Sequence, residues 1–172
     1  MSDIDAYELR VGIPSGWEAR IFRRAEAGEL RIAEVAGASA PTGEQTFPVV
    51  HVATVPLPID AADYGGGVVE TLGPGDALVV LKEFDPAEAT EPLFEASGIP
   101  RALDPEHFDP SGLQRRLPNQ AGLQVFFHEA GRAFCLYVVL GDYARRNEVV
   151  PRVNQVLASI RIDAPIPPVP AP

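Results

Sequence analysis

GLQVFFHEAGRAFCLYVVLG, residues 122–141, carries the strongest structural signal in the chain. Two runs rich in Phe, Val, Leu and Tyr flank the short break EAGR at residues 129–132, a pattern that predicts a β-hairpin. Because side chains alternate across a strand, a turn at Ala130 and Gly131 puts four facing pairs on one side: Leu123 with Val138, Val125 with Leu136, Phe127 with Phe134, and Glu129 with Arg132. We expect the last pair to be an ion pair at an exposed tip.

The second face of this hairpin is expected to carry three further pairs: Gln124 with Tyr137, Phe126 with Cys135, and His128 with Ala133. A slip of one residue on one strand would mismatch every pair, which supports this register. Both faces are largely apolar, so we expect both to be covered by other parts of the chain.

The remaining hydrophobic patterns predict five strands and two helices. The strands are expected at residues 7–13, 17–22, 30–35, 47–57 and 76–84, with a loose leader at 1–6 and a loop at 37–45. One helix is expected over residues 60–72, and glycines 65–67 within it are interpreted as close packing on the sheet. A second helix is expected to begin near Asn147 or slightly earlier, with Pro151 in its first turn and an apolar stripe at Val149, Val150, Val153, Val156, Leu157 and Ile160.

These elements predict an α/β fold of the α+β type. The expected architecture is an α/β/α sandwich with a central, mainly antiparallel sheet and helices on both faces. Residues 1–163 are expected to form a single domain. Residues 164–172, APIPPVPAP, are expected to form a Pro-rich flexible tail, for which a frayed end is favoured over a ligand of an SH3-type domain.

The charge of the chain is concentrated in its middle. The net charge is −10, and residues 60–110 hold twelve acids against Lys82 and Arg101, a balance of −10 by themselves. This disfavours nucleic acid and anionic lipid as ligands and makes a basic protein a candidate partner, although acids kept for solubility explain the charge more simply. The excess of Arg over Lys indicates a GC-rich genome of the actinobacterial type.

Composition also bears on location and membrane contact. The first residues, MSDIDAYELRV, do not have the pattern of a secretory signal, and no apolar run approaches the roughly 20 residues of a membrane span. We therefore expect a cytoplasmic protein without membrane insertion.

No motif predicts catalysis, a metal or a cofactor. Cys135 is the only cysteine, and the three histidines lie far apart without metal-binding spacing. The best enzymatic combination is Cys135 with His128, but in the predicted register these two residues do not face each other. A cysteine between Phe134 and Leu136 in a strand also behaves as a small hydrophobe. Carboxylates are also present around residues 70–85, without any sign of a sugar-sized cleft.

Residues 86–120, which we call the excursion, are proline-rich and irregular, and recurring apolar residues predict that they pack over one face of the sheet. Long acidic loops often carry function, so this is the expected partner surface. The candidate contact residues are Asp85, Glu88, Glu91, Phe94, Glu95 and Phe108. The alternative is a small-molecule binder or enzyme with a pocket between sheet and excursion, near Gln124, His128 and Tyr137. A third class, a subunit of a larger assembly, would be poorly soluble alone.

Three segments together resemble the PsbP-like superfamily: VGIPSGW at 11–17, FCLYVVLG at 134–141 and NEVVPRVNQVLASI at 147–160. The resemblance implies the α/β/α layering and a role in binding proteins rather than in catalysis. Some bacterial members are secretion-associated chaperones, and others are envelope lipoproteins, whose signal peptide and lipobox cysteine this sequence does not show. The expected function is therefore a non-catalytic protein-interaction module, either an adaptor or a chaperone-like protein.

Overall fold

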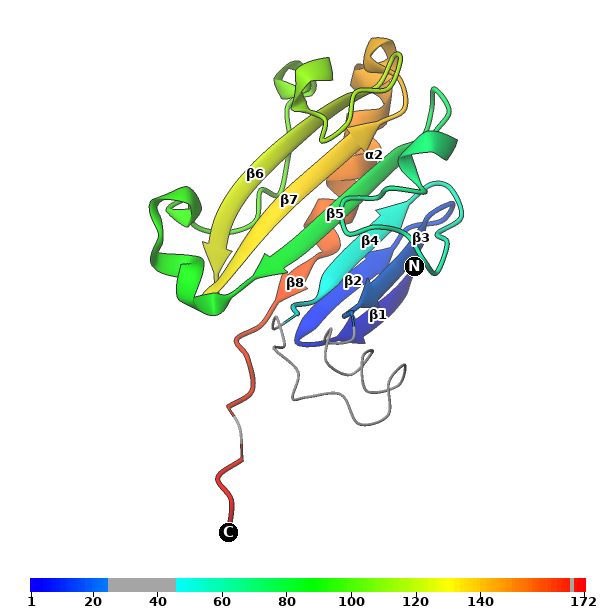
Figure 1. Cartoon of the computed structure of the whole chain (residues 1–172). Helices are drawn as coiled ribbons and strands as arrows, with labels where there is room; N and C mark the ends of the chain where they lie inside the picture. Colours follow the sequence, from blue (N-terminus) through cyan, green and yellow to red (C-terminus); the bar gives the residue numbers. More distant parts are fainter. Residues whose placement is uncertain (25–45, 168) are drawn as a thin grey trace, which may run out of the picture.

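The computed structural model describes residues 1–24, 46–167 and 169–172, which form two antiparallel sheets (Figure 1). The larger sheet has five strands in the order β3-β4-β5-β7-β6, and the smaller has three in the order β1-β2-β8. The strands are β1 Ser2–Ala6, β2 Leu9–Ile13, β3 Glu18–Phe22, β4 Val49–Ala53, β5 Ala77–Phe84, β6 Ala121–Glu129, β7 Arg132–Leu140 and β8 Arg161–Ile162. The strand and loop predicted at 30–35 and 37–45 lie outside the described residues.

The predicted hairpin is confirmed in its strands and in its register. β6 and β7 pair antiparallel, and all seven predicted pairs face each other, from Leu123 with Val138 to Glu129 with Arg132. Ala130 and Gly131 both have positive φ, 54° and 74°, as a two-residue turn of type I′ requires. The register follows from the sequence because only this pairing sorts the side chains into two consistent faces.

The ion pair predicted at the hairpin tip is wrong. Arg132 is only 3% exposed, and its guanidinium forms a double hydrogen bond with Glu83 of β5, at 2.9 and 2.6 Å. It also donates to the backbone carbonyls of Tyr7, Glu8 and Asp163. The arginine therefore joins the small sheet to the large one, because those carbonyls belong to the turn between β1 and β2 and to the residue after β8.

The one α-helix in the described part of the chain is α2, Arg146–Ser159. It follows the 3-10 turn η6 Tyr143–Arg145, which begins where the Asp142 carboxylate accepts from the Ala144 amide. The predicted apolar stripe is confirmed, since every one of its members is fully buried. The helix begins just before Asn147, within the predicted range, but Pro151 falls in its second turn rather than its first.

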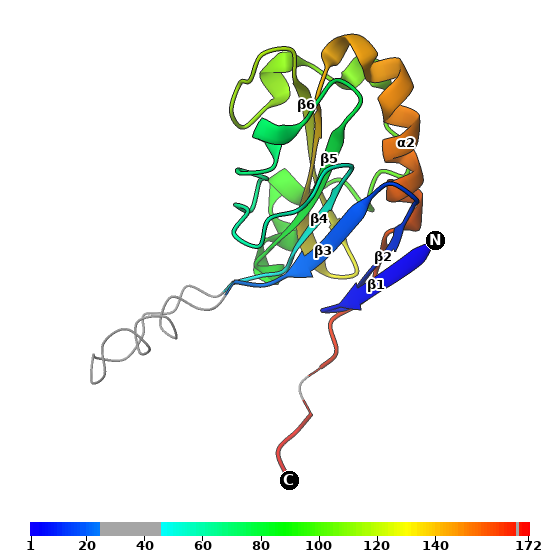
Figure 2. The ribbon, with the colours of Figure 1, turned by 90° about the vertical axis from the view of Figure 1, so that its right-hand side faces the viewer.

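The prediction of an α/β/α sandwich is wrong, because α2 covers only one face of the large sheet (Figure 2). Residues 60–72, predicted to be helical, form turns and a single 3-10 turn, η1 Val69–Thr71. Gly65 and Gly67 have φ values of 84° and 93°, which are incompatible with a right-handed helix. The remaining 3-10 turns also lie in irregular segments: η2 Pro86–Thr90, η3 Pro92–Phe94, η4 Pro105–His107 and η5 Pro110–Gly112.

Residues 1–6, predicted to be loose, instead form β1. Ile4 pairs with Val11 of β2, and Tyr7 and Glu8 make the intervening turn with φ values of 55° and 57°. Neither turn residue is a glycine, asparagine or aspartate, so the sequence shows no ordinary hairpin-turn signal here. The strand forms because β2 pairs with β8 along one edge and offers the backbone groups of its other edge to residues 2–6.

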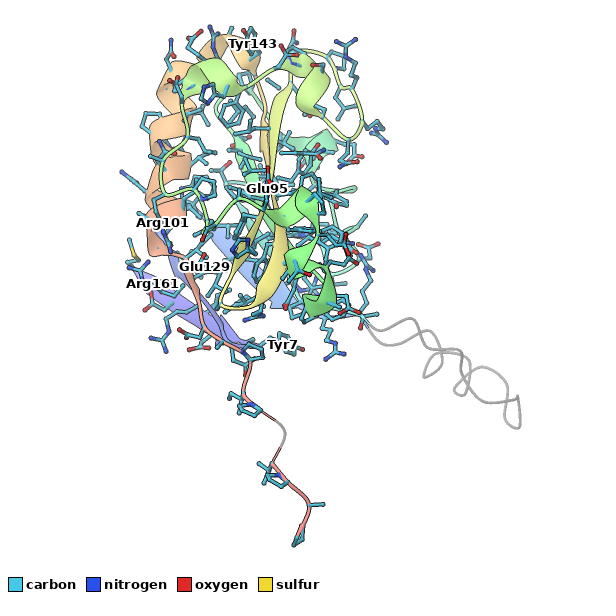
Figure 3. The ribbon with its side chains drawn as sticks, turned by 90° about the vertical axis from the view of Figure 1, so that its left-hand side faces the viewer. Tyr7, Glu95, Arg101, Glu129, Tyr143 and Arg161 are labelled. Carbon is cyan, nitrogen blue, oxygen red and sulfur yellow. The ribbon has the colours of Figure 1, made fainter. Side chains whose placement is uncertain are left out.

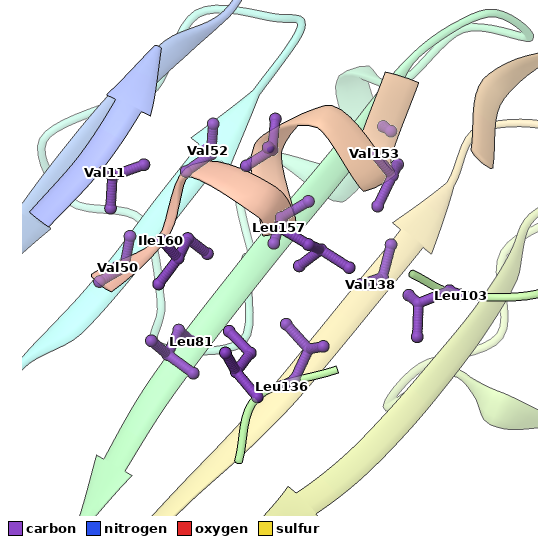
Figure 4. Packing of buried hydrophobic residues seen from close by; sticks show 14 of the residues in the cluster. Val11, Val50, Val52, Leu81, Leu103, Leu136, Val138, Val153, Leu157 and Ile160 are labelled. Carbon is purple, nitrogen blue, oxygen red and sulfur yellow. The ribbon is translucent and has the colours of Figure 1, made fainter. Parts of the chain in front are cut away.

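Each face of the large sheet has its own apolar cluster. On the α2 face, Val153, Leu157 and Ile160 pack against side chains of the central strands and of β2 and β4 (Figure 4). On the opposite face, the cluster contains Val68, Val69, Leu78, Val80, Cys135, Tyr137 and Val139. We call this second face the loop-covered face. No helix in the described residues is long and apolar enough to cross a membrane.

Candidate functional site

The excursion packs against the sheet, as its apolar residues predict. The prediction that it covers a single face is wrong, because it contacts both faces. It starts on the loop-covered face, where Phe94 contacts the rings of Phe84 and Phe126 at centroid distances of 5.5 and 5.8 Å. It crosses the edge strand β6 where Ser97 bridges His128, and it reaches the α2 face, where the Leu103 amide donates to Asn154 at 2.8 Å. It returns across β6 where Asp109 pairs with Gly122. The excursion therefore wraps around β6.

Two of the predicted partner contacts, Phe94 and Phe108, are each 1% exposed. Their burial follows from this route, since Phe94, the last residue of η3, packs on the loop-covered face and Phe108 enters the core on the α2 face. Neither ring is available to a partner. The large apolar side chain that the excursion does expose is Leu93, at 59%. Sequence reasoning missed it because a 3-10 turn buries one of two adjacent apolar residues, and no periodicity tells which.

The acidic candidates divide by their contacts. Asp85 is half-buried and accepts from the Ala87 amide at 2.9 Å, so it caps η2. Glu91 and Glu95 are exposed on either side of Leu93, and Glu88 is half-buried. These three glutamates form no ion pair with any residue that the structure describes. We call Glu88, Glu91, Leu93 and Glu95 the acidic surface.

Asp85 and Glu88 also line a cavity of about 530 Å³ together with Arg24, Asp63 and Lys82. Asp63 binds both cations, Arg24 at 2.6 Å and Lys82 at 3.0 Å. Burial raises the pKa of Asp63, but the hydrogen bonds from Arg24 and Lys82 outweigh it and hold the pKa below its ordinary value. Asp63 is thus paired with both cations of this cavity, whereas Asp85 and Glu88 form no ion pair with the described residues.

The alternative pocket residues share a face of the hairpin but have different surroundings. His128 is tied to the excursion, with its Nδ1 2.6 Å from the Phe94 carbonyl oxygen. Gln124 is half-buried on β6, beside Tyr137. Tyr137 is 2% exposed, and its hydroxyl accepts from the Gln114 amide at 2.9 Å. Of the three, Tyr137 lines a cavity, which has a volume of about 220 Å³ and also contains Tyr64, Val69, Leu113 and Gln120 in its wall.

The groups with nucleophilic potential on this face are held neutral. Burial raises the pKa of the Cys135 thiol to about 12, and burial together with the neighbouring Cys135 and Asp63 raises that of Tyr64 to about 12. A protonated thiol is a poor nucleophile. Nowhere in the described residues do three or more His, Cys, Asp or Glu side chains come together as a metal site requires.

The middle of β6 is open along its outer edge. Glu129 and Arg132 close the two-residue turn, so the backbone groups of odd-numbered β6 residues point to β7 and those of even-numbered residues point outward. Outward groups are paired at both ends: Gly122 with Asp109, and His128 with Ala96 and Gly98. The amides and carbonyls of Gln124 and Phe126 have no partner among the described residues. Figure 3 looks toward this edge, with Glu95 near one of the crossings.

Comparisons with protein-family models, with curated proteins and with solved structures give no match to this chain. They neither confirm nor refute the PsbP-like resemblance, which stays a prediction. The candidate site is therefore defined by its geometry alone: an open stretch of β6 between two crossings of the excursion, next to the acidic surface.

Proposed function

We propose that this protein is a non-catalytic protein-interaction module that binds an extended, basic segment of a partner along the open edge of β6. The observation that carries the proposal is the set of outward amides and carbonyls of Gln124 and Phe126, which no described residue pairs. Addition of a strand to a sheet edge is a common mode of peptide recognition, in which main-chain hydrogen bonds supply affinity and alternate side chains supply specificity.

The excursion determines what can occupy the edge. If two copies of the chain paired their β6 strands antiparallel about Val125, Gly122 of one would face His128 of the other. Both positions are already filled, by Asp109 and by Ser97. A second copy is therefore blocked at both ends. A single strand of about three residues fits opposite residues 124–126, because the two crossings occupy both ends of the roughly 20 Å between Gly122 and His128.

Charge supports a basic occupant. Glu91 and Glu95 precede the crossing at Ser97 directly and form no ion pair with the described residues. Lysine or arginine on the partner would meet these carboxylates at the rim, where charge speeds association and selects partners more than it adds affinity. Leu93, and not the predicted contact residue Phe94, supplies an exposed apolar contact with acids on either side.

The proposal retains the adaptor or chaperone-like role and the cytoplasmic location predicted from the sequence. A short, edge-limited site suits recognition of flexible segments of other proteins. The free, buried Cys135 of the protein is compatible with a reducing compartment such as the cytoplasm.

The test is selection of binders from a library of short linear peptides, followed by calorimetry of the selected peptides on the full chain. We expect peptides with Lys or Arg next to β-branched residues, and binding that weakens as salt rises. The Gln124→Pro variant removes an outward amide without touching the pairing with β7, because proline is tolerated on sheet edges. It should weaken binding about tenfold, the effect of about 1.4 kcal/mol.

Glu91→Gln and Glu95→Gln should each slow association, whereas Asp3→Asn makes the same charge change on β1, away from the edge, and should leave binding unaltered. A library that yields no binder would overturn the proposal. Binders that are not basic, or that bind Gln124→Pro as tightly as the natural chain, would overturn it as well.

A further inference from the structure

The open stretch of β6 also restricts the direction in which a partner can pair with it. This inference rests on the proposed function and specifies the sequence of the bound segment. Four backbone groups are available, the amides and carbonyls of Gln124 and Phe126, because no described residue pairs them. The two crossings of the excursion already occupy the positions opposite Gly122 and His128. A bound strand therefore has to reach all four groups without entering these two positions.

An antiparallel strand meets this condition with three residues. In an antiparallel ladder, two residues that face each other as a hydrogen-bonded pair exchange both of their bonds. One residue opposite Gln124 and one opposite Phe126 thus use all four groups, and a single residue opposite Val125 joins them. One position stays free between this segment and each crossing, and there the partner can turn away from the edge.

A parallel strand needs five residues for the same four bonds. In a parallel ladder, a residue bonds to the neighbours of the residue that faces it, as His128 does with Ala96 and Gly98. Bonds to the four open groups would therefore use backbone groups of residues opposite positions 123–127. Both ends of the segment would then lie directly beside a crossing, with no free position in which to turn. The gap thus favours the antiparallel direction.

At the His128 end of the open stretch, the unpaired charge is negative. Phe94 places its carbonyl oxygen 2.6 Å from His128 Nδ1, so the next residue, Glu95, lies beside this end (Figure 3). Glu95 is exposed and belongs to the acidic surface, whose glutamates form no ion pair with the described residues. Arg101 is also near this end, but it already pairs with Glu129 at 3.6 Å. This end therefore attracts a basic residue of a partner.

The Gly122 end has the opposite balance. The Asp109 carboxylate is engaged there, since it accepts from the amide and the hydroxyl of Ser111 at 2.7 and 2.6 Å. Arg116 lines a cavity together with Pro110, the residue after Asp109. The hydrogen bonds from Ser111 and the nearby charge of Arg116 lower the pKa of Asp109. Arg116 is exposed and forms no ion pair with any described residue, so this end does not favour a basic residue.

We propose that the β6 edge binds an extended segment antiparallel to β6, with one or two basic residues on the N-terminal side of the three paired residues. In this direction the N-terminal side of the segment lies at the His128 end, and its C-terminal side lies at the end that Arg116 flanks. The middle paired residue faces Val125 on the same side of the sheet, where a β-branched residue is a favourable cross-strand partner. The recognised order is thus basic residues followed by a short β-branched stretch.

The experiment compares two blocked peptides of the same composition and opposite order, acetyl-Gly-Lys-Lys-Thr-Val-Thr-Gly-amide and acetyl-Gly-Thr-Val-Thr-Lys-Lys-Gly-amide. Titration of the isotopically labelled full chain, followed by amide chemical shifts, gives both dissociation constants. At low salt the first peptide should bind about fivefold more tightly, the effect of one or two exposed ion pairs. The difference should shrink as salt rises, because salt screens exposed charges.

A nitroxide label on the first peptide measures the direction. A labelled cysteine in place of the first glycine should broaden the amide signals of Gly98 and His128 more than those of Gly112 and Gly122. The same label in place of the last glycine should give the reverse. If the N-terminal label broadens both ends equally, or the Gly122 end more strongly, the antiparallel assignment is wrong although the proposed function still stands.

Two double variants test the charge order. Glu91→Gln with Glu95→Gln should lose most of the difference between the peptides. Asp3→Asn with Asp60→Asn makes the same change of charge at exposed positions of β1 and of the segment after β4, and should retain it. Equal affinity of the natural chain for both peptides at low salt would overturn the charge order alone. If neither peptide binds, or if both bind Gln124→Pro as tightly as the natural chain, the proposed function fails and this inference fails with it.

Discussion

The two faces of the large sheet are covered in different ways. On one face, the side chains that α2 packs on the strands of this sheet are apolar, and its last residue, Ser159, bonds to Gly12 of β2. On the other, irregular segments cover the sheet, and side chains beneath them bond to their backbone: His51 to the Asp63 carbonyl at 2.8 Å, Gln120 to the Val69 carbonyl at 2.7 Å and Tyr137 to the Gln114 amide at 2.9 Å.

The difference has a simple physical origin. A helix satisfies its own backbone, so an apolar stripe is enough to cover a sheet. An irregular segment brings unpaired amides and carbonyls to a buried surface, and polar side chains must satisfy them. The same holds beyond the end of α2, where Arg132, paired with Glu83, donates to the carbonyls of Tyr7, Glu8 and Asp163. Covers of the two kinds should therefore respond differently to mutation.

The largest effect is expected from Arg132→Met. It leaves the Glu83 carboxylate buried without its partner and removes the bonds to three carbonyls, so the free energy of unfolding should fall by about 3–5 kcal/mol. Urea unfolding measures this. The double variant Arg132→Met with Glu83→Met should recover much of the loss, since no unpaired charge remains. A single variant within about 1 kcal/mol of the natural chain would contradict the structural role of this pair.

Leucines under the two covers should differ in cost. Leu157→Ala deletes a fully buried side chain between α2 and the sheet and should cost about 2–5 kcal/mol. Leu113→Ala, on the half-buried cover of the opposite face, should cost about 1 kcal/mol, because less apolar area is removed from water in folding. Equal losses in urea unfolding would show that the two covers pack equally well.

Two glycines separate backbone strain from packing. Gly65 has a φ of 84°, and an added Cβ would lie 2.2 Å from Cδ2 of the buried Leu78. Gly65→Ala should cost about 1–2 kcal/mol for the left-handed backbone and about 1–3 kcal/mol for overpacking. Gly131→Ala has a similar φ but open space, so it should cost only the first amount. Thermal or urea unfolding of both variants measures the difference, and equal costs would refute close packing of Gly65 on the sheet.

The smallest effect is a pH dependence from His51. Burial lowers its pKa, although the Asp63 carbonyl opposes this, so the folded state takes up a proton less readily than the unfolded state does. The contribution to stability is complete above the unfolded pKa of about 6.5 and is lost as the pH falls from there toward the lower folded value. Unfolding measured between about pH 7 and pH 5 should show this decline. His51→Gln, which retains a donor for the Asp63 carbonyl, should reduce the slope; an unchanged slope would contradict the assignment.

The sequence predicted the structure correctly where apolar residues repeat with the period of a strand or of a helix. The hairpin register and the stripe of α2 follow from alternation and from helical periodicity, two properties that the chain carries locally. The prediction failed at residues 60–72, where an aspartate suited to cap a helix and the following Gly-Pro-Gly suggested helix ends, but Gly65 and Gly67 adopt left-handed backbone. The turns of the excursion did have a local signal that was overlooked: Asp85-Pro86, Asp104-Pro105 and Asp109-Pro110 each begin a 3-10 turn capped by the aspartate.

The candidate site was only partly within reach of the sequence. The acidic character of the excursion and the placement of Gln124, His128 and Tyr137 on one hairpin face follow from residue types and alternation. That Phe94 is buried while Leu93 is exposed, and that the excursion closes both ends of β6, depends on contacts between distant segments. Local patterns determine strands, their pairing and the apolar side of a helix, because these need only neighbours in the chain. Which backbone groups stay unpaired at an edge, and which buried acceptor lacks a donor, is decided only when the whole chain has packed.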